Sequence, residues 1–253
     1  MGKKCIVCGN RVLETVDLGK FGLSQSFESN TERPRNEPVS YRYALQQCAR
    51  CHHIQAKYLH PSLVKTGFSD NYEVYDLRTK SREPEHHFEE LARWIGSNVK
   101  IDQTKGIAGF CYKDISLMEL LNNTNSVDAR DVLYEGDDTL QITHTIMREN
   151  YNHDISNSEK KYDLIIARHI LEHIPNPASF IKMLNRQLNA NGSLYLELPY
   201  PSHMTGRGFA GQVWEEHCSY FTEQSIKEMA RQLGLTYKVI YYENGNEPLL
   251  CCI

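Results

Sequence analysis

From about residue 104 onward, mostly apolar runs alternate with segments whose apolar positions follow helical spacing. Residues 162–167 and 193–199 are two such runs, and each has the length of a strand buried on both faces. Residues 180–188 lie between them and place their apolar side chains on one face of a helix. The alternation predicts an α/β fold, a doubly wound and mostly parallel sheet with helices on its faces.

Smaller signals complete the expected order of elements. Asp114 is expected to cap one helix, Asn191-Gly192 to close another, and Gly96 to end a helix over residues 87–95. Asn244-Gly245 predicts the turn of a final antiparallel hairpin. We expect strands at 105–110, 132–134, 153–155, 162–167, 193–199, 236–242 and 249–253, and further helices at 114–121, 140–147, 180–188 and 222–233.

Composition and charge narrow the class of protein. The chain has 253 residues, 40% of them hydrophobic, which is enough to bury a sizeable core and argues against disorder. Its net charge of −4 argues against bulk electrostatic binding of nucleic acid or of an anionic membrane. No run approaches 18 apolar residues, and no apolar signal core follows the N-terminus. We therefore expect a cytoplasmic, soluble protein.

The first 60 residues show little helical periodicity and contain two C-x-x-C pairs, Cys5 with Cys8 and Cys48 with Cys51. In each pair a tight turn directs both thiolates toward one ion, which is the spacing of a zinc knuckle. Disulfides are the poorer explanation in a cytoplasmic chain. We expect a small β-rich module, residues 1–60, that holds Zn²⁺ with these four cysteines. Four thiolates complete a tetrahedral shell, so the expected role of the metal is structural.

The stretch from residue 162 to residue 175 contains Leu171-Glu172-His173-Ile174 and carries the most specific signal in the chain. It resembles the fourth strand and the following loop of class I S-adenosylmethionine-dependent methyltransferases. The resemblance implies a seven-stranded Rossmann-like sheet with an antiparallel edge, and S-adenosylmethionine as the methyl donor at the strand-end loop. His169 lies at the carboxyl end of this strand, where open α/β sheets bind ligands, and is an active-site candidate. Capping and packing of a helix is the alternative role for Glu172 and His173.

A narrower resemblance rests on features spread over nearly the whole chain: the two C-x-x-C pairs, Tyr72-x-x-Tyr75, and Trp214-Glu215-Glu216-His217-Cys218-Ser219-Tyr220-Phe221. Together they resemble the zinc-containing sugar C-methyltransferases, which methylate a carbon beside a ketone on nucleotide-linked deoxysugars. By this resemblance Glu216 and His217 match the active-site Glu-His pair of that family. Either Tyr72 or Tyr75 matches its active-site tyrosine. Trp214 stands where many members have a tyrosine, which removes a hydroxyl from the expected site.

Two departures from that family bear on the substrate and the donor. Members usually continue into a C-terminal domain that helps to bind the nucleotide sugar, whereas this sequence stops at the last expected strand. The turn after the first strand normally has several glycines, whereas here Gly109 is followed by Phe110 and later by Tyr112. Glycine lets the backbone approach a ligand closely, so we expect these two rings to crowd the donor.

The chemistry of carbon methylation assigns roles to the candidates. A base must remove a proton next to a carbonyl, and a histidine suits this task near neutral pH. We expect His217 to be this base, with Glu216 orienting it or binding the substrate hydroxyls, and Tyr72 or Tyr75 stabilising the oxyanion. The alternative for His217 and Tyr220 is capping and packing of the following helix. The expected donor-binding residues are Gly106 and Gly109 on the methionine side, Glu135 (or Asp128) at the ribose, Asp154 near the adenine, and Arg168.

These expectations define three segments: a zinc-binding module (1–60), a helical and aromatic connecting segment (61–100) and a Rossmann-like methyltransferase domain (101–253). The leading function is methyl transfer from S-adenosylmethionine to a carbon of a small, sugar-like ketone. One alternative is methylation of oxygen or nitrogen in a small molecule, and another is a degenerate, non-catalytic binding subunit. We expect a monomer or homodimer with a small-molecule partner and no bound nucleic acid or membrane.

Overall fold

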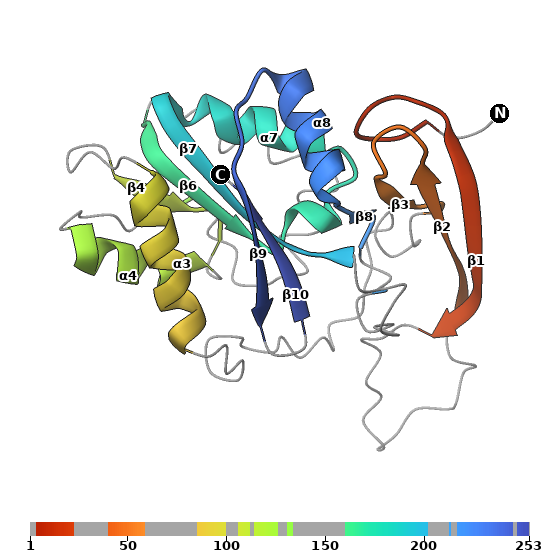
Figure 1. Ribbon diagram of the computed structural model, residues 1–253, viewed down its shortest axis with the longest axis horizontal. Helices are drawn as coiled ribbons and strands as arrows, with labels where there is room; N and C mark the ends of the chain where they lie inside the picture. The colour runs from red at the N-terminus through yellow and green to blue at the C-terminus, as the bar shows by residue number, and fades with distance from the viewer. Residues whose placement is uncertain are drawn as a thin grey trace, which may run out of the picture.

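The computed structural model describes residues 4–22, 40–58, 85–99, 106–111, 114–125, 131–133, 160–201, 213, 217–244 and 247–252, which form two sheets with flanking helices (Figure 1). The strands are β1 (Val12–Gly22), β2 (Ser40–Cys48), β3 (Ile54–Ala56), β4 (Ile107–Gly109), β5 (Asp131–Val132), β6 (Tyr162–Arg168), β7 (Leu188–Pro199), β8 (Ser219–Tyr220), β9 (Val239–Asn244) and β10 (Glu247–Cys252). The helices are α3 (Glu85–Asn98), α4 (Ile115–Asn125), the short 3-10 helix η2 (Leu171–His173), α7 (Pro177–Arg186) and α8 (Glu223–Leu233).

The larger sheet has the strand order β5-β4-β6-β7-β10-β9. β5, β4, β6 and β7 pair in parallel, whereas β10 pairs antiparallel with both β7 and β9. This confirms a mostly parallel sheet with an antiparallel hairpin at one edge. The strand expected at 153–155 and the helix expected at 140–147 lie outside the described residues, so a seventh strand stays a prediction.

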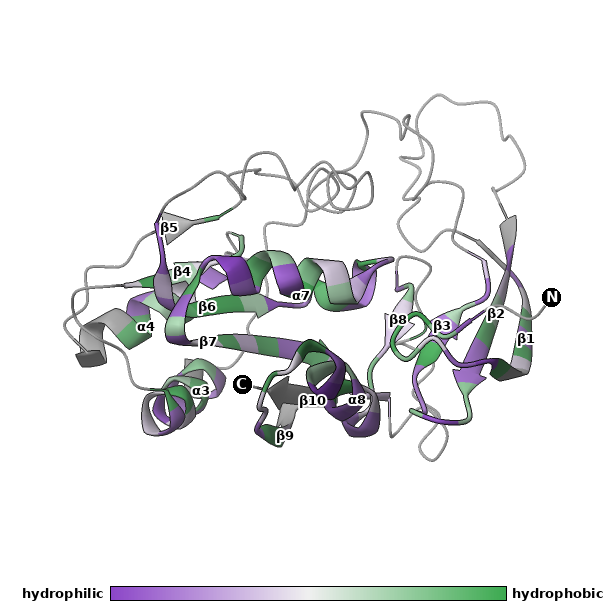
Figure 2. Ribbon diagram, turned by 90° about the horizontal axis from the view of Figure 1, so that it is seen from above, coloured by the Kyte–Doolittle hydropathy of each residue, from purple (hydrophilic) through white to green (hydrophobic). Residues whose placement is uncertain are grey.

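Both faces of the larger sheet are covered, which explains why every residue of β6 is buried. Ile165 and Ala167 belong to a core cluster with residues of α7 and α8, and Leu164 and Ile166 belong to a second cluster with residues of α3 and α4. Figure 1 shows the two helix pairs on opposite sides of the sheet, and Figure 2 shows the green apolar strand β6 among the helices. α3, expected in a connecting segment, therefore packs on this sheet.

The helix boundaries follow local signals in part. α8 follows a capping box of Thr222 and Ser225 and is closed by Gly234, whose φ of 70° is left-handed. Two expected helix ends are wrong. α3 continues past Gly96 to Asn98, and Asn191-Gly192 lies inside β7 because α7 already ends at Arg186.

The N-terminal sheet has the order β1-β2-β3-β8 and contains a strand from far along the chain. β8 pairs antiparallel with β3, so residues 219–220 complete a sheet whose other strands come from the first 56 residues. The β-rich character expected for this module is confirmed, and its fourth strand was not foreseen. In the described part of the chain, no helix is long and apolar enough to cross a membrane.

Candidate functional site

His169 occupies the carboxyl end of β6 and has a backbone conformation that non-glycine residues seldom adopt. Its φ is 49°, a left-handed value that costs about 1–3 kcal/mol where the surroundings impose it. Its amide donates to the carbonyl oxygen of Glu197 at 2.9 Å. On its ring, Nε2 lies 3.1 Å from Glu197 Oε1 and Nδ1 lies 3.7 Å from Glu172 Oε1. The imidazole is thus held between two carboxylates, with 23% of its side chain exposed.

Glu197 is the centre of a buried group of polar side chains. Its carboxylate accepts two hydrogen bonds from the Arg168 guanidinium, both at 2.9 Å, and one from the Tyr195 hydroxyl at 3.1 Å. His87 Nε2 lies 3.4 Å from the same carboxylate, and the Phe88 ring covers the Arg168 guanidinium at 4.7 Å. Arg168 was expected to bind the donor. It is only 2% exposed and bound to Glu197, so its position argues against that role.

The charges of these residues shift one another. Burial alone would raise the pKa of Glu172. Its hydrogen bond with His169 and its electrostatic attraction to the nearby histidines outweigh burial and lower that pKa to about 2. Burial likewise raises the pKa of Glu197, and the Arg168 charge holds it well below its usual value. For His169, burial lowers the pKa, yet bonds to both carboxylates raise it to about 10. His169 therefore keeps its proton at neutral pH.

Glu172, His173 and His217 form a second cluster beside this one, and all three are buried. One ligand-type atom from each lies within 4.8 Å of the others, and the two histidine rings meet edge to face at 4.8 Å between centroids. Glu172 Oε1 is 3.7 Å from His169 Nδ1 and 3.9 Å from His173 Nε2, so Glu172 links both clusters. The Cys218 thiol donates to the carbonyl of His173 at 2.9 Å, which ties the His217 segment to η2.

Two buried tyrosines, Tyr43 and Tyr220, lie next to His217, and sequence reasoning missed Tyr43. The Tyr43 hydroxyl donates to the His217 carbonyl at 3.0 Å and lies 2.8 Å from the Tyr220 hydroxyl. Tyr43 comes from β2 and gives no local signal, because it reads as one position of an alternating strand. The tyrosines expected at the oxyanion, Tyr72 and Tyr75, lie outside the described residues.

The turn after β4 differs from the expected crowding by Phe110. Its ring is fully buried and packs edge to face against Phe180 at 5.0 Å, so it belongs to the core under α7. Gly109 has a packing reason of its own, because a Cβ there would lie 2.5 Å from Met118 Sδ and 2.8 Å from Asp114 Cβ. The glycine lets α4 approach β4, because atoms of Met118 and Asp114 occupy the space that a side chain at position 109 would need.

Asp114 and Gly106 complete the description of this turn. Asp114, expected as a helix cap, directly precedes α4, and its carboxylate accepts from the amides of Cys111 at 3.0 Å and Arg168 at 3.2 Å. Gly106 lies just before β4, at the amino end of the strand, which argues against its expected place beside the donor. Outside the described residues lie Asp128, Glu135, Asp154, Tyr112, Trp214 and Glu216.

Residues 57–238, more than half of the chain, match the model of a protein family described as a methyltransferase domain. The chain belongs to this methyltransferase domain family. The expectation of a methyltransferase enzyme is thereby confirmed at the level of the family. Among curated proteins, no relative matches.

Solved structures with a similar arrangement include other methyltransferases. A candidate O-methyltransferase from Nostoc punctiforme is 9% identical over 67% of this chain, with a TM-score of 0.44, and the match spans 56% of that protein's length. Magnesium protoporphyrin IX methyltransferase from Synechocystis with bound S-adenosylhomocysteine is 12% identical, with coverages of 76% and 90% and a TM-score of 0.40. A plantazolicin methyltransferase is 14% identical, with coverages of 70% and 86% and a TM-score of 0.45.

The four cysteines of the methyltransferase's N-terminal module come together as expected. Their sulfur atoms all lie within 4.8 Å of one another, with Cys5 and Cys51 at 3.5 Å and Cys8 and Cys48 at 3.4 Å. A tetrahedral Zn²⁺ with bonds of about 2.3 Å has sulfur atoms about 3.8 Å apart, so this arrangement fits the ion. The pKa of Cys5 is lowered to about 5, first by its hydrogen bond with Cys51 and also by backbone amides.

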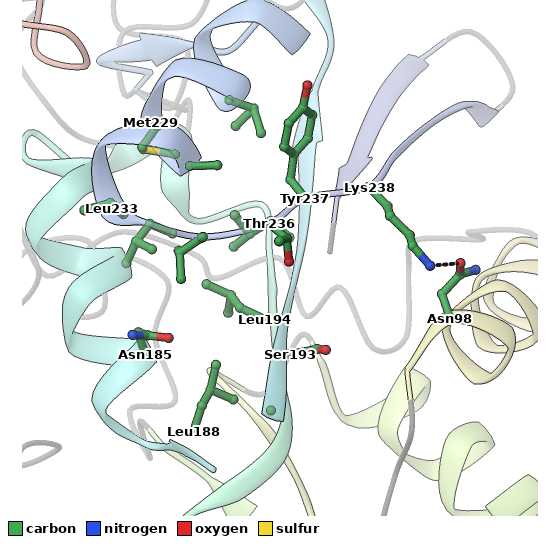
Figure 3. Close-up of a pocket in the computed structure, with 16 residues that line it drawn as sticks. Asn98, Asn185, Leu188, Ser193, Leu194, Met229, Leu233, Thr236, Tyr237 and Lys238 are labelled. Carbon is green, nitrogen blue, oxygen red and sulfur yellow. Dashed lines mark hydrogen bonds between the residues drawn. The ribbon is translucent and has the colours of Figure 1, made fainter. Parts of the chain in front are cut away.

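A cavity of about 290 Å³ lies apart from these clusters (Figure 3). It opens between α7, α8 and β7, and its walls are mostly apolar side chains such as Leu188, Leu194 and Met229. At its rim Lys238 donates to Asn98 at 3.0 Å. Within the described residues, none of the candidate catalytic side chains lines this cavity, so it is separate from the described part of the candidate site.

Proposed function

We propose that this methyltransferase-domain protein methylates a carbon next to a ketone on a small, sugar-like acceptor, with S-adenosylmethionine as donor. The observation that supports it most is the buried His217 beside the Glu172 carboxylate, close to the carboxyl end of β6. Ligands of parallel α/β sheets bind at this end of the strands. A histidine next to a buried carboxylate is the arrangement by which enzymes hold a base in the orientation for proton transfer.

In the proposed reaction, the His217 imidazole takes the proton from the carbon next to the ketone. The electron pair of that C–H bond passes into the enolate, and the enolate carbon then bonds to the methyl group. The donor supplies a methyl group on a positively charged sulfur, and its C–S bond breaks to leave S-adenosylhomocysteine. Glu172 stabilises the imidazolium that forms when His217 accepts the proton, because opposite charges close together in a buried site attract strongly.

The two histidines at this edge have different roles in the proposal. His169 already carries a proton at neutral pH, since its pKa is raised to about 10 between two carboxylates whose bonds outweigh its burial. It therefore cannot accept another proton and is unsuited to be the base. We assign it an electrostatic role, in which its positive charge favours the enolate. This leaves His217 as the base. Glu172, for which packing was the alternative role, takes the supporting role that the sequence assigned to Glu216.

Two cofactor assignments remain part of the proposal. The burial of Phe110 against Phe180 supports donor binding, because this ring packs in the core and does not fill the turn after β4. Glu135 and Asp154 remain the proposed ribose and adenine residues. The four cysteines are proposed to hold a structural Zn²⁺, whose function is to join the two ends of the N-terminal module.

The decisive experiment supplies S-adenosylmethionine with a ¹³C-labelled methyl group and a panel of keto-deoxysugars, free and nucleotide-linked, and locates the label by NMR. A labelled methyl group on carbon is expected. A label on oxygen or nitrogen would replace this proposal with the corresponding heteroatom transfer. Failure to bind S-adenosylhomocysteine in calorimetry would favour a non-catalytic binding subunit.

A companion measurement isolates the proton-transfer step. With S-adenosylhomocysteine bound, the enzyme is expected to exchange the acceptor's α-hydrogen for solvent deuterium. His217→Ala should stop this exchange and leave S-adenosylhomocysteine affinity unchanged. The matched control is His52→Asn, because His52 is exposed and has a φ of 56° that asparagine tolerates. Exchange by His217→Ala at the wild-type rate would exclude His217 as the base.

A further inference from the structure

The segment that carries His217 is held by the N-terminal module from one side. β8 pairs antiparallel with β3, so that Ile54 lies opposite Tyr220. One step before β8, the carbonyl of Cys218 accepts from the amide of Ala56 at 3.0 Å. The backbone directly after His217 is therefore fixed by two connections to a part of the chain more than 160 positions earlier.

A chain of two hydroxyls extends this attachment to His217 itself. The Tyr43 hydroxyl lies 3.0 Å from the His217 carbonyl and 2.8 Å from the Tyr220 hydroxyl, and both tyrosines are 2% exposed. A carbonyl only accepts, so Tyr43 donates its single proton to it. Tyr220 must then donate to Tyr43, which gives the chain one direction and makes each bond strengthen the other.

We infer that Tyr43 is a positioning residue for His217, an inference that rests on the proposed role of His217 as the base. Tyr43 holds the His217 carbonyl on the side of the module, and the Cys218 thiol binds the His173 carbonyl on the side of η2. Between these attachments the His217 ring packs edge to face on His173. The direction of the imidazole is thus set jointly by the N-terminal module and by the methyltransferase sheet.

The test is Tyr43→Phe, which removes one hydroxyl and keeps the ring. A displacement of a catalytic group by about 1 Å lowers rates by up to about 100-fold, so we expect kcat to fall about 10- to 100-fold. The rate of α-hydrogen exchange with solvent should fall by the same factor. The KM for the donor and the affinity for S-adenosylhomocysteine should stay near wild type, and the unfolding temperature should fall only by the few degrees that the loss of one buried hydroxyl causes. Tyr58→Phe is the matched control, since Tyr58 belongs to the same module and is 47% exposed.

A second variant checks the direction of the hydroxyl chain. Tyr220→Phe keeps the ring next to His217 and frees the Tyr43 hydroxyl from its donor, so kcat should fall about 3- to 10-fold. The double variant should match Tyr43→Phe alone, because Tyr220 acts on His217 through Tyr43. If Tyr43→Phe does not fold cooperatively, the loss of kcat in Tyr220→Phe decides the question.

Two results would overturn the inference. One is a kcat within twofold of wild type in Tyr43→Phe, or in Tyr220→Phe where that variant decides. The other is a loss of kcat accompanied by an equal fold-loss of donor affinity, which indicates a purely structural role. Failure of the proposed function is distinguishable, because the wild-type protein would then show no α-hydrogen exchange, or His217→Ala would exchange at the wild-type rate. An inactive His217→Ala with a fully active Tyr43→Phe removes the positioning role alone.

Discussion

Replacement of Glu197 by glutamine tests the buried charges behind the candidate site. The substitution keeps the shape of the side chain and removes its negative charge. It leaves the Arg168 guanidinium, 2% exposed, without the carboxylate that accepts two of its hydrogen bonds at 2.9 Å. Breaking a buried ion pair by removing one partner costs about 3–5 kcal/mol. The glutamine oxygen can still accept from Tyr195 or Arg168, so we expect the lower end of that range.

A loss of about 3 kcal/mol in the free energy of unfolding corresponds to a fall of about 6–12 °C in the unfolding temperature. Urea unfolding followed by circular dichroism measures the free energy directly. Glu119→Gln is the matched control, because Glu119 lies on the exposed side of α4, and its effect should stay within about 0.5 kcal/mol. A loss below about 1 kcal/mol in Glu197→Gln would refute the reasoning. The double variant Arg168→Met with Glu197→Leu should recover much of the loss, because it removes both charges together.

Four further outcomes follow from single contacts. The free energy of unfolding of the wild type should fall as the pH rises from 6.5 to about 10, because the folded-state pKa of His169 is raised to about 10. Urea unfolding of His169→Asn over the same pH range should not show this fall. Phe110→Ala should cost about 3–5 kcal/mol in the same assay, since it empties a fully buried site. Gly109→Ala should cost about 1–3 kcal/mol because its Cβ meets Met118, as calorimetry will show. Cys48→Ser should abolish the stoichiometric zinc expected by elemental analysis of the purified protein.

Strands buried on both faces were the most predictable elements. The run at 162–167 became β6 with one residue added, because burial on both faces leaves a mostly apolar sequence, here interrupted only by Asp163. The glycine signals misled in two places. Gly96 is exposed with open space around it, and the burial of Ile95 and Val99 on either side stabilises the helix past it. Gly192 lies within β7, where glycine is required because a Cβ would lie 2.8 Å from the Tyr162 carbonyl oxygen.

The candidate site was predictable only where a motif names its residues. His169 and His217 were identified in this way and lie in neighbouring clusters, linked through Glu172. Tyr43 could not be found, because its contact with His217 spans 174 positions and depends on the pairing of β3 with β8. Glu197 did carry a signal: an acid inside an apolar strand must meet a positive charge when it is buried.

The balance of charges at the carboxyl edge fits the transfer proposed for this site. Arg168 and His169 carry two positive charges, and Glu172 and Glu197 carry two negative ones, so these buried groups sum to zero. Transfer from a sulfonium to an enolate cancels a positive charge against a negative one as the new bond forms. An environment that solvates ions poorly favours such a step over the separated charges, provided that fixed dipoles and charges orient the reactants. The compensated charges around His169 supply that orientation without adding a net charge that would repel either the donor or the enolate.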